Sequence, residues 1–139
     1  MRAYASTTRL LSAQLQSEHG LTLNAYECLL VLSTEPEQRL KRVDLARRLL
    51  LTPSGVTRML DGLEDAGLVE RASCSTDRRI IYAQLTAAGS DKLKEAAGSH
   101  VASIHELFEG QLSEAEIRKL SDVLDKLPDV AGPDGSCGT

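Results

Sequence analysis

The 139 residues match the usual size of one domain, and a composition that is 42% hydrophobic and 26% charged is typical of a folded chain rather than a disordered one. No stretch approaches the roughly 20 apolar residues of a membrane span, and no apolar block of a secretory signal stands near the start, so we expect a cytoplasmic protein. The formal net charge is −4, but residues 40–82 hold eight Lys/Arg and six Asp/Glu, a net of +2 that leaves −6 for the remainder. A basic middle between acidic flanks fits a DNA-facing lobe, although ordinary solvated faces would give the same asymmetry.

The first part of the chain predicts two helices. The first spans about residues 4–18, and Gly20 ends it because glycine tolerates the left-handed backbone of a helix stop. The second begins at Asn24, an N-cap residue type, and is broken by residues 35–38. Their apolar side chains are Leu10, Leu11 and Leu15 in the first helix, and Tyr26, Cys28, Leu29, Leu30 and Leu32 in the second.

Two shorter helices joined by a tight turn follow. The first spans residues 43–50, and its side chains expected to face inward are Val43, Ala46 and either Leu49 or Leu50. Thr52 is the N-cap of the second, with Pro53 at the first helical position, where its missing N–H costs nothing. Its buried stripe consists of Val56, Met59, Leu60 and Leu63, and Gly67 ends it.

The hydrophobic period then changes to that of a β-hairpin. Residues 68–72 and 80–85 are short and β-rich, and the polar segment 73–79 connects them as a long basic tip. Thr86 caps a long helix reaching about Glu109, in which Gly89 and Gly98 are tolerable interruptions. A capping box of Ser113 and Glu116 opens a last helix to about Leu127, and residues 128–139 are expected to be a disordered tail.

A helix-turn-helix followed at once by a hairpin is the arrangement of a winged helix. The predicted fold class is therefore mainly α with a small β-wing (α+β). Residues 1–127 form one domain, with the winged helix at about 40–86 and dimerisation helices at about 2–19 and 87–127.

The second helix of the pair and the hairpin tip carry side chains suited to DNA. The helix presents small hydroxyls, a glycine and one arginine opposite its apolar stripe, and its free N–H groups can bind a phosphate oxygen. Arginines at the tip suit a narrow minor groove, and Asp77 is expected to orient one of them through a charge-assisted hydrogen bond. The candidate DNA-binding residues are Thr52, Ser54, Gly55, Thr57, Arg58, Asp77, Arg78 and Arg79.

These segments resemble the MarR family of regulators. Residues 43–49 (VDLARRL) and 52–58 (TPSGVTR) are similar to its pattern "seLAerL…s.ssvTR", and residues 60–71 (LDGLEDAGLVER) to "vdrLeerGLVeR". Residues 77–79 (DRR) with 85–89 (LTAAG) match the signature "DRR…LTeaG".

The resemblance covers about residues 10–127 and implies a homodimer on a pseudo-palindromic operator, acting as a repressor. Recognition helices would enter successive major grooves, and wings would reach the flanking minor grooves. By motif position, Arg79 matches the wing-tip arginine of the family, with Arg78 nearby.

The terminal helices are more apolar than a winged helix needs to cover itself, so association through them is expected. The expected interface includes Leu10, Leu107, Phe108, Leu120 and Leu124. The wider apolar set adds Leu11, Leu15, Val101, Ile104, Ile117, Val123 and Leu127.

The resemblance also implies that a small phenolic or anionic effector binds between the dimerisation helices and the DNA-binding lobe. The polar residues expected near such a crevice are Arg9, His19 and Tyr26, with His100 and His105 as further candidates. All of these residue types also fit a surface or a satisfied structural position. No tryptophan is present, which weighs against the urate-responsive branch, and no cofactor is expected.

The cysteines leave a redox alternative open. Cys28, Cys74 and Cys137 are far apart, which argues against a disulfide framework and a CxxC zinc site. Cys28 is expected to be a small buried hydrophobe, whereas Cys74, near the wing, is expected to be exposed and easier to oxidise. His100 and His105 are five apart, about 140° around a helix rather than the i, i+4 spacing of ligand pairs, so no metal is expected.

Two other classes of function compete with a DNA-binding regulator. An enzyme with a Cys/His pair would need an oriented nucleophile in a pocket, and no motif supplies one. A winged-helix module that binds protein would favour an acidic recognition face, whereas Arg58, Arg78 and Arg79 are basic.

Overall fold

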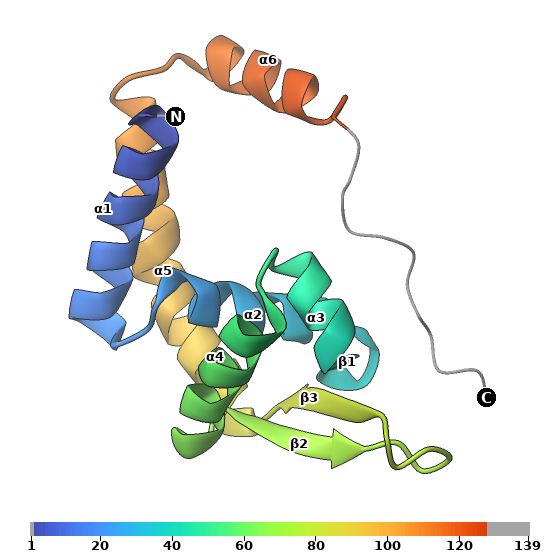
Figure 1. Cartoon of the computed structure of the whole chain (residues 1–139). Helices are drawn as coiled ribbons and strands as arrows, with labels where there is room; N and C mark the ends of the chain where they lie inside the picture. Colours follow the sequence, from blue (N-terminus) through green and yellow to red (C-terminus); the bar gives the residue numbers. More distant parts are fainter. Residues whose placement is uncertain (1, 128–139) are drawn as a thin grey trace.

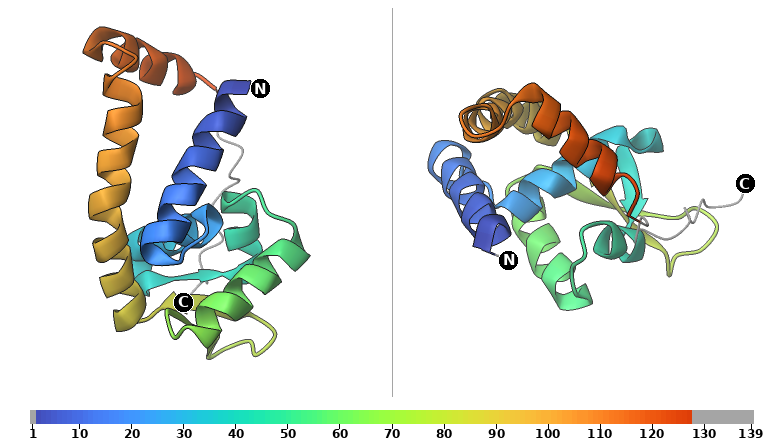
Figure 2. Two further views of the ribbon diagram at one scale, coloured as in Figure 1. Left: turned by 90° about the vertical axis from the view of Figure 1, so that its left-hand side faces the viewer. Right: turned by 90° about the horizontal axis from the view of Figure 1, so that it is seen from above.

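Two long antiparallel helices, α1 (Arg2–His19) and α5 (Ala87–Glu109), lie side by side in the computed structural model, which describes residues 2–127 (Figure 1). The helix α6 (Glu114–Leu124) follows the end of α5 and extends sideways from that end of the pair (Figure 2). The predicted tail, residues 128–139 with Cys137, lies outside the described residues.

A second lobe contains α2 (Leu23–Thr34), α3 (Arg42–Arg48), α4 (Pro53–Asp65) and a three-stranded sheet, at the other end of the α1–α5 pair (Figure 1). The base of α5 contacts α2, which joins the two lobes. This order of elements confirms the fold class expected from the sequence, mainly α with a β-wing.

The sheet has the antiparallel order β1–β3–β2. The predicted hairpin is confirmed as β2 (Val69–Ser73) and β3 (Ile81–Leu85). The third strand, β1 (Arg39–Lys41), follows a short 3₁₀ turn, η1 (Pro36–Gln38), and pairs with β3. Its three residues are too few to show alternation, so no sequence pattern predicts it.

The start of α2 differs from the prediction. Thr22 is the N-cap, and its Oγ1 accepts a hydrogen bond from the Ala25 N–H at 3.1 Å, whereas Asn24 lies in the first helical turn. Leu21 is buried and Leu23 packs against the core, so the chain must turn into the helix before residue 24.

The inner face of α3 also differs. Leu45 is fully buried, whereas Val43 and Leu50 are exposed, and Ala46 and Leu49 pack against the core as expected. Because α3 begins directly after β1, the pairing of β1 with β3 decides which side of α3 faces the core. The apolar residue nearest the start of the helix does not. Leu50 has left the helix, with a φ of 53°.

Gly89 is required by the fold rather than merely tolerated. A Cβ at this position would lie 2.0 Å from the Leu68 carbonyl oxygen and 2.8 Å from a Leu85 methyl carbon. Thr86, the confirmed N-cap of α5, strengthens the same contact, since its hydroxyl donates to the Gly67 carbonyl at 2.7 Å and accepts from the Gly89 N–H. The start of α5 is thereby fastened to the turn between α4 and β2.

The core runs from the lower part of α1 through α2 to the inner faces of α4, the sheet and α5. Its largest fully buried side chains are Leu15, Leu29, Leu32, Leu45 and Leu60. Leu15 therefore belongs to the core of a single chain rather than to an interface between chains. Among the described residues, no helix combines the length and hydropathy needed to cross a membrane.

Candidate nucleic-acid interface

Local hydrogen bonds in the turn between α3 and α4 fix the start of α4. Thr52 caps α4, and its Oγ1 accepts from the Gly55 N–H at 3.1 Å, with Pro53 at the first helical position. A Cβ at Gly55 would lie 3.1 Å from that hydroxyl. The absence of a side chain at residue 55 therefore leaves room for the Thr52 cap, and it would also let a duplex approach closely.

The exposed face of α4 carries the predicted polar residues. Val56, Leu60 and Leu63 are buried on the opposite face, which confirms the apolar stripe. Ser54, Thr57 and Arg58 are exposed. The Thr57 hydroxyl donates to the Pro53 carbonyl at 3.0 Å, so its methyl group is the part available to a partner.

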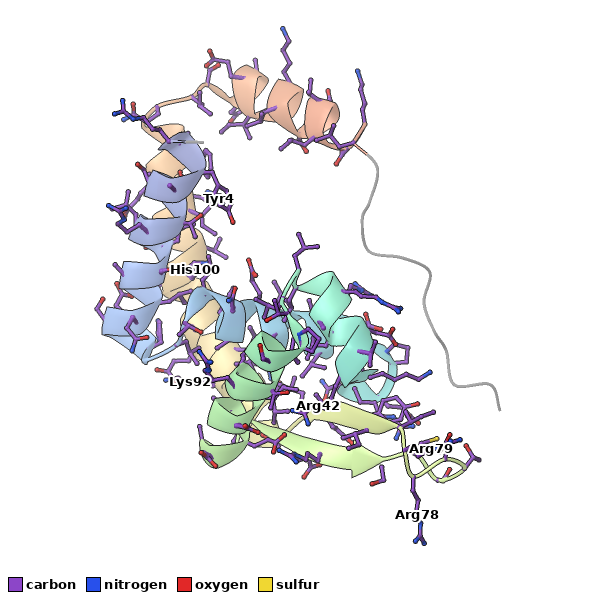
Figure 3. The ribbon with its side chains drawn as sticks, viewed as in Figure 1. Tyr4, Arg42, Arg78, Arg79, Lys92 and His100 are labelled. Carbon is purple, nitrogen blue, oxygen red and sulfur yellow. The ribbon has the colours of Figure 1, made fainter. Side chains whose placement is uncertain are left out.

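The hairpin tip projects away from the helices, and Arg78 and Arg79 extend from it (Figure 3). The expected bond from Asp77 is present, because its Oδ1 accepts from the backbone N–H of Arg79 at 3.0 Å and from Nε at 3.2 Å. Arg79 Nη2 donates to the other carboxylate oxygen at 3.3 Å. These bonds hold the pKa of Asp77 below its ordinary value, first through the Arg79 side chain and then through its backbone. The Arg79 side chain is nevertheless 91% exposed.

Arg58 and Arg78 contrast with Arg79. Within residues 2–127 neither forms an ion pair or a side-chain hydrogen bond. Both guanidinium groups keep their full donor capacity, which suits phosphate or base-edge recognition.

Arg71, which the sequence analysis did not select, joins the wing to α4. Its Nε lies 2.9 and 2.7 Å from the two carboxylate oxygens of Glu64, and its Nη2 lies 3.0 Å from Asp61 Oδ1. The sequence shows two carboxylates one helical turn apart on α4 and an arginine on the following strand. Whether they meet depends on how β2 folds back on α4.

The candidate effector residues do not converge on one open site within the chain. His19 and Tyr26 both lie where α1, α2 and α5 meet: His19 Nε2 is 2.6 Å from Ser99 Oγ, and the Tyr26 ring is 4.6 Å from that of His100. Arg9 is exposed and precedes His19 by ten helical residues, roughly 15 Å along α1.

His100 is the buried member of this junction, with a relative exposure of 3%. Its Nδ1 is 2.9 Å from Gln14 Oε1, an acceptor, so this ring nitrogen carries the proton and donates. Burial, and secondarily the nearby His19, lowers the pKa of His100. His105 lies farther along α5, exposed and 3.0 Å from Glu109. No cluster among residues 2–127 has the three ligands that a metal ion needs.

The cysteines do not form an exposed thiol site in the part of the chain that the structure describes. Cys28 is buried as expected, and burial raises its pKa to about 12. The prediction for Cys74 is wrong: it is buried, with its Sγ 3.2 Å from Thr76 Oγ1, because the chain curls inward where the wing loop leaves β2.

The far end of the molecule presents an uncovered apolar surface. No residue of α6 is buried, and its exposed apolar residues are Leu120, Val123 and Leu124, followed by Leu127. Leu10 and Val101 are exposed on α1 and α5, and Leu107 and Phe108 are half-buried. The capping box of Ser113 and Glu116 is confirmed, so α6 forms without a packed face.

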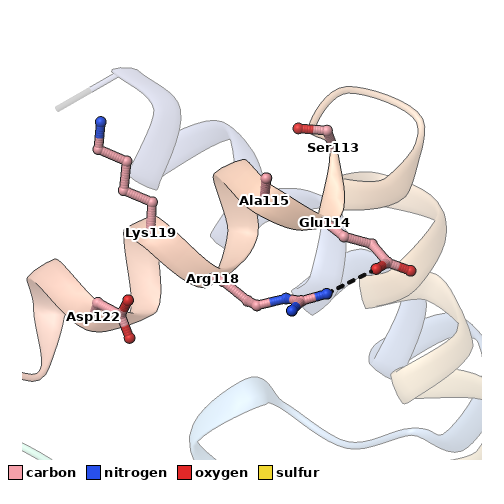
Figure 4. Close-up of a pocket in the computed structure, with 6 residues that line it drawn as sticks. All are labelled: Ser113, Glu114, Ala115, Arg118, Lys119 and Asp122. Carbon is pink, nitrogen blue, oxygen red and sulfur yellow. Dashed lines mark hydrogen bonds and ion pairs between the residues drawn. The ribbon is translucent and has the colours of Figure 1, made fainter.

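The opposite face of α6 is polar and carries a shallow hollow (Figure 4). It is lined by Ser113, Glu114, Ala115, Arg118, Lys119 and Asp122. Arg118 pairs with Glu114 at 3.0 Å across it. All six residues are exposed and belong to one helix and its cap, so the hollow has no buried polar group that would hold a ligand.

Comparison with known proteins agrees with this geometry. A family model described as the MarR family matches residues 21–81. The HTH-type transcriptional repressor Mb2911 of Mycobacterium bovis is 34% identical over 108 residues, covering 78% of this chain and 76% of the relative.

Two solved structures from Streptomyces coelicolor are similar over most of their length. AbsC, described as a MarR family transcriptional regulator, has a TM-score of 0.77 and 33% identity, covering 88% of this chain and 85% of that one. Sco3205, described as a MarR family transcriptional regulator in complex with DNA, has a TM-score of 0.81 and 28% identity, with coverages of 89% and 80%.

Proposed function

The chain belongs to the MarR family of DNA-binding transcriptional regulators, which are not enzymes, and we propose that it represses transcription by binding a pseudo-palindromic operator as a homodimer. The observation that carries this proposal is the pairing of an arginine-bearing outer face on α4 with a projecting wing whose Arg79 is pre-oriented by Asp77. Both features lie in the same lobe, away from the apolar end of the molecule (Figure 3).

In this proposal α4 enters the major groove. Arg58 reaches a guanine edge or a phosphate, the Thr57 methyl contacts a thymine methyl, and Thr52, Ser54 and Gly55 allow the helix start to approach the backbone. The wing tip, residues 77–79, enters the flanking minor groove, whose negative potential attracts guanidinium groups. The crystallised DNA complex of Sco3205, a structural neighbour, supports DNA as the partner of this fold.

The homodimer is proposed to form through residues 2–19 and 87–127. The exposed apolar residues of α6, together with Leu10 on α1, support it, because a monomer would leave them in water. Two-fold symmetry would then place the two α4 helices about one turn of DNA apart.

We further propose that a small phenolic or anionic effector releases the protein from DNA. His19 and Tyr26 lie at the junction of the two lobes, where a ligand would alter the relation between them, and Arg9 would have to contribute from elsewhere on α1. The redox alternative has less support, since both described cysteines are buried.

The DNA-binding test uses a duplex selected from random sequence by the wild-type protein. Arg79→Ala should weaken binding on the order of tenfold to a hundredfold, as expected for one desolvated charged contact, measured by fluorescence anisotropy. The matched control is Arg118→Ala, which removes another exposed arginine, at the opposite end of the molecule, and should leave affinity nearly unchanged. Equal affinities for wild type and Arg79→Ala would contradict the role of the wing.

A further inference from the structure

The proposed DNA-reading helix carries more negative than positive charge. Between Pro53 and Asp65 its only basic residue is Arg58, against three acidic residues. Asp61 follows Arg58 by three positions and so lies on the same exposed face. A carboxylate there would repel the phosphates of any duplex approaching that face.

Two of these carboxylates are engaged by one side chain from the wing. Arg71 Nε lies 2.9 and 2.7 Å from the Glu64 oxygens, and Nη2 lies 3.0 Å from Asp61. One guanidinium thus spans two acidic residues one helical turn apart. The planar, rigid fork of arginine suits such an arrangement, which the single ammonium of lysine cannot reproduce.

The position of Arg71 follows from the strand it occupies. Side chains alternate along β2, so Arg71 lies on the same face as Val69, which is buried in the core. Arg71 is opposite Ala83 in the antiparallel register with β3, so its side chain is presented by a strand that leads directly into the wing. The contact therefore pairs opposite charges and also joins α4 to the hairpin.

We propose that Arg71 is a positioning residue for DNA binding, which neutralises the Asp61 and Glu64 carboxylates and fixes the wing to α4 at the angle at which both reach the duplex. This inference rests on the proposed function, because it assigns a role to Arg71 at the same interface. Arg71 and Asp61 are both about half exposed and Glu64 is only partly buried, so the network contributes little to folding stability. Its main effect is on the affinity for a polyanion.

The test is a double-mutant cycle in DNA affinity, with the wild-type-selected duplex as the probe. Arg71→Ala should weaken binding by about tenfold, because it exposes two carboxylates and releases the wing. Neutralising the acids with Asp61→Asn and Glu64→Gln should raise affinity more in the Arg71→Ala background than in the wild type. Arg71→Lys should fall between wild type and Arg71→Ala. Melting temperatures within a few degrees of the wild type verify that each variant is folded.

The control pair is Arg118 with Glu114 on α6, also joined at 3.0 Å and exposed. Arg118→Ala and Glu114→Gln should change DNA affinity little and without coupling. If Arg71 instead contacts a phosphate directly, Arg71→Ala lowers the slope of log affinity against log salt concentration by about 0.9. Neutralising Asp61 and Glu64 then raises the affinity of Arg71→Ala no more than it raises that of the wild type. That result, or an unchanged affinity of Arg71→Ala, overturns the proposal. A wild type that selects no duplex would instead overturn the proposed function itself.

Discussion

Gly89 shows how a single residue constrains the whole winged helix. The chain of α5 passes the Leu68 carbonyl so closely that a Cβ at residue 89 would overlap it at 2.0 Å. Because the obstructing atom is backbone, it cannot move aside like the end of a flexible side chain. The sequence shows a glycine inside a helical pattern but not the neighbour that requires it.

Gly89→Ala is predicted to lower the free energy of unfolding by about 3 kcal/mol, since the start of α5 must separate from the turn after α4. Gly98→Ala, in the same helix, is the matched control: its Cβ would meet nothing within 4 Å, so it should stabilise the protein by about 0.5–1 kcal/mol through helix propensity. Urea denaturation of both variants measures the difference. Equal stabilities would contradict the close approach.

His100 gives the stability of the protein a predictable pH dependence. Its pKa is lowered from 6.5 in the folded state, by burial first and by His19 second, so the folded protein keeps it neutral where the unfolded chain binds a proton. Stability should therefore decrease as the pH falls below about 6.5. Glu18 and Glu95 lie 3.8 and 3.6 Å from the ring of His19, the neighbour of His100.

The direct measurement is an NMR titration of the His100 ring protons, with the exposed His105 as an internal comparison. His100 should titrate below 6.5. A pKa at or above 6.5 for His100 would show that its burial does not penalise the charged form.

At the scale of elements, α6 is an amphipathic helix whose apolar face stays exposed among residues 2–127. Leu124→Glu is predicted to disrupt the proposed dimer, because it places a charge in a surface that would be buried between subunits. Lys119→Glu, on the polar face of the same helix, is the matched control and should leave the dimer intact. Light scattering gives the masses, and a dimeric Leu124→Glu protein would contradict the assigned interface.

The elements could largely be predicted from the sequence because their ends are marked by local chemistry. Thr52 with Pro53, Thr86, and Ser113 with Glu116 act through atoms within a few residues, and all three caps are confirmed. The predictions that failed concern what non-local packing decides. The inner face of α3 depends on β1 pairing with β3, and the burial of Cys74 depends on the path of the wing loop.

The candidate site divides in the same way. Short-range sequence pattern predicts the arginines of α4 and the wing. It also predicts the bond between Asp77 and Arg79, which are two residues apart. The contact of Arg71 with Asp61 and Glu64 spans seven to ten residues and required the structure. Because Arg71 pairs with Asp61 and Glu64, it offsets part of the negative charge that α4 would present to a polyanionic partner.

At the scale of the whole molecule, the two ends have opposite properties. The lobe with α4 and the wing lies at one end and α6 lies at the other (Figure 1). The first end exposes Arg58, Arg78 and Arg79, and α6 exposes apolar residues. The α1–α5 pair connects the two ends. An acidic chain with a net charge of −4 can therefore turn one lobe to DNA, while the symmetric partner of the proposed dimer would join at the other end.

Hydroxyl-radical footprinting of the full chain on a duplex selected from random sequence tests the central claim most directly. The account predicts two protected half-sites, related by approximate two-fold symmetry and centred about one helical turn apart, with protection extending into the flanking minor grooves. A selection that enriches no duplex, or a single unsymmetrical protected site, would contradict it.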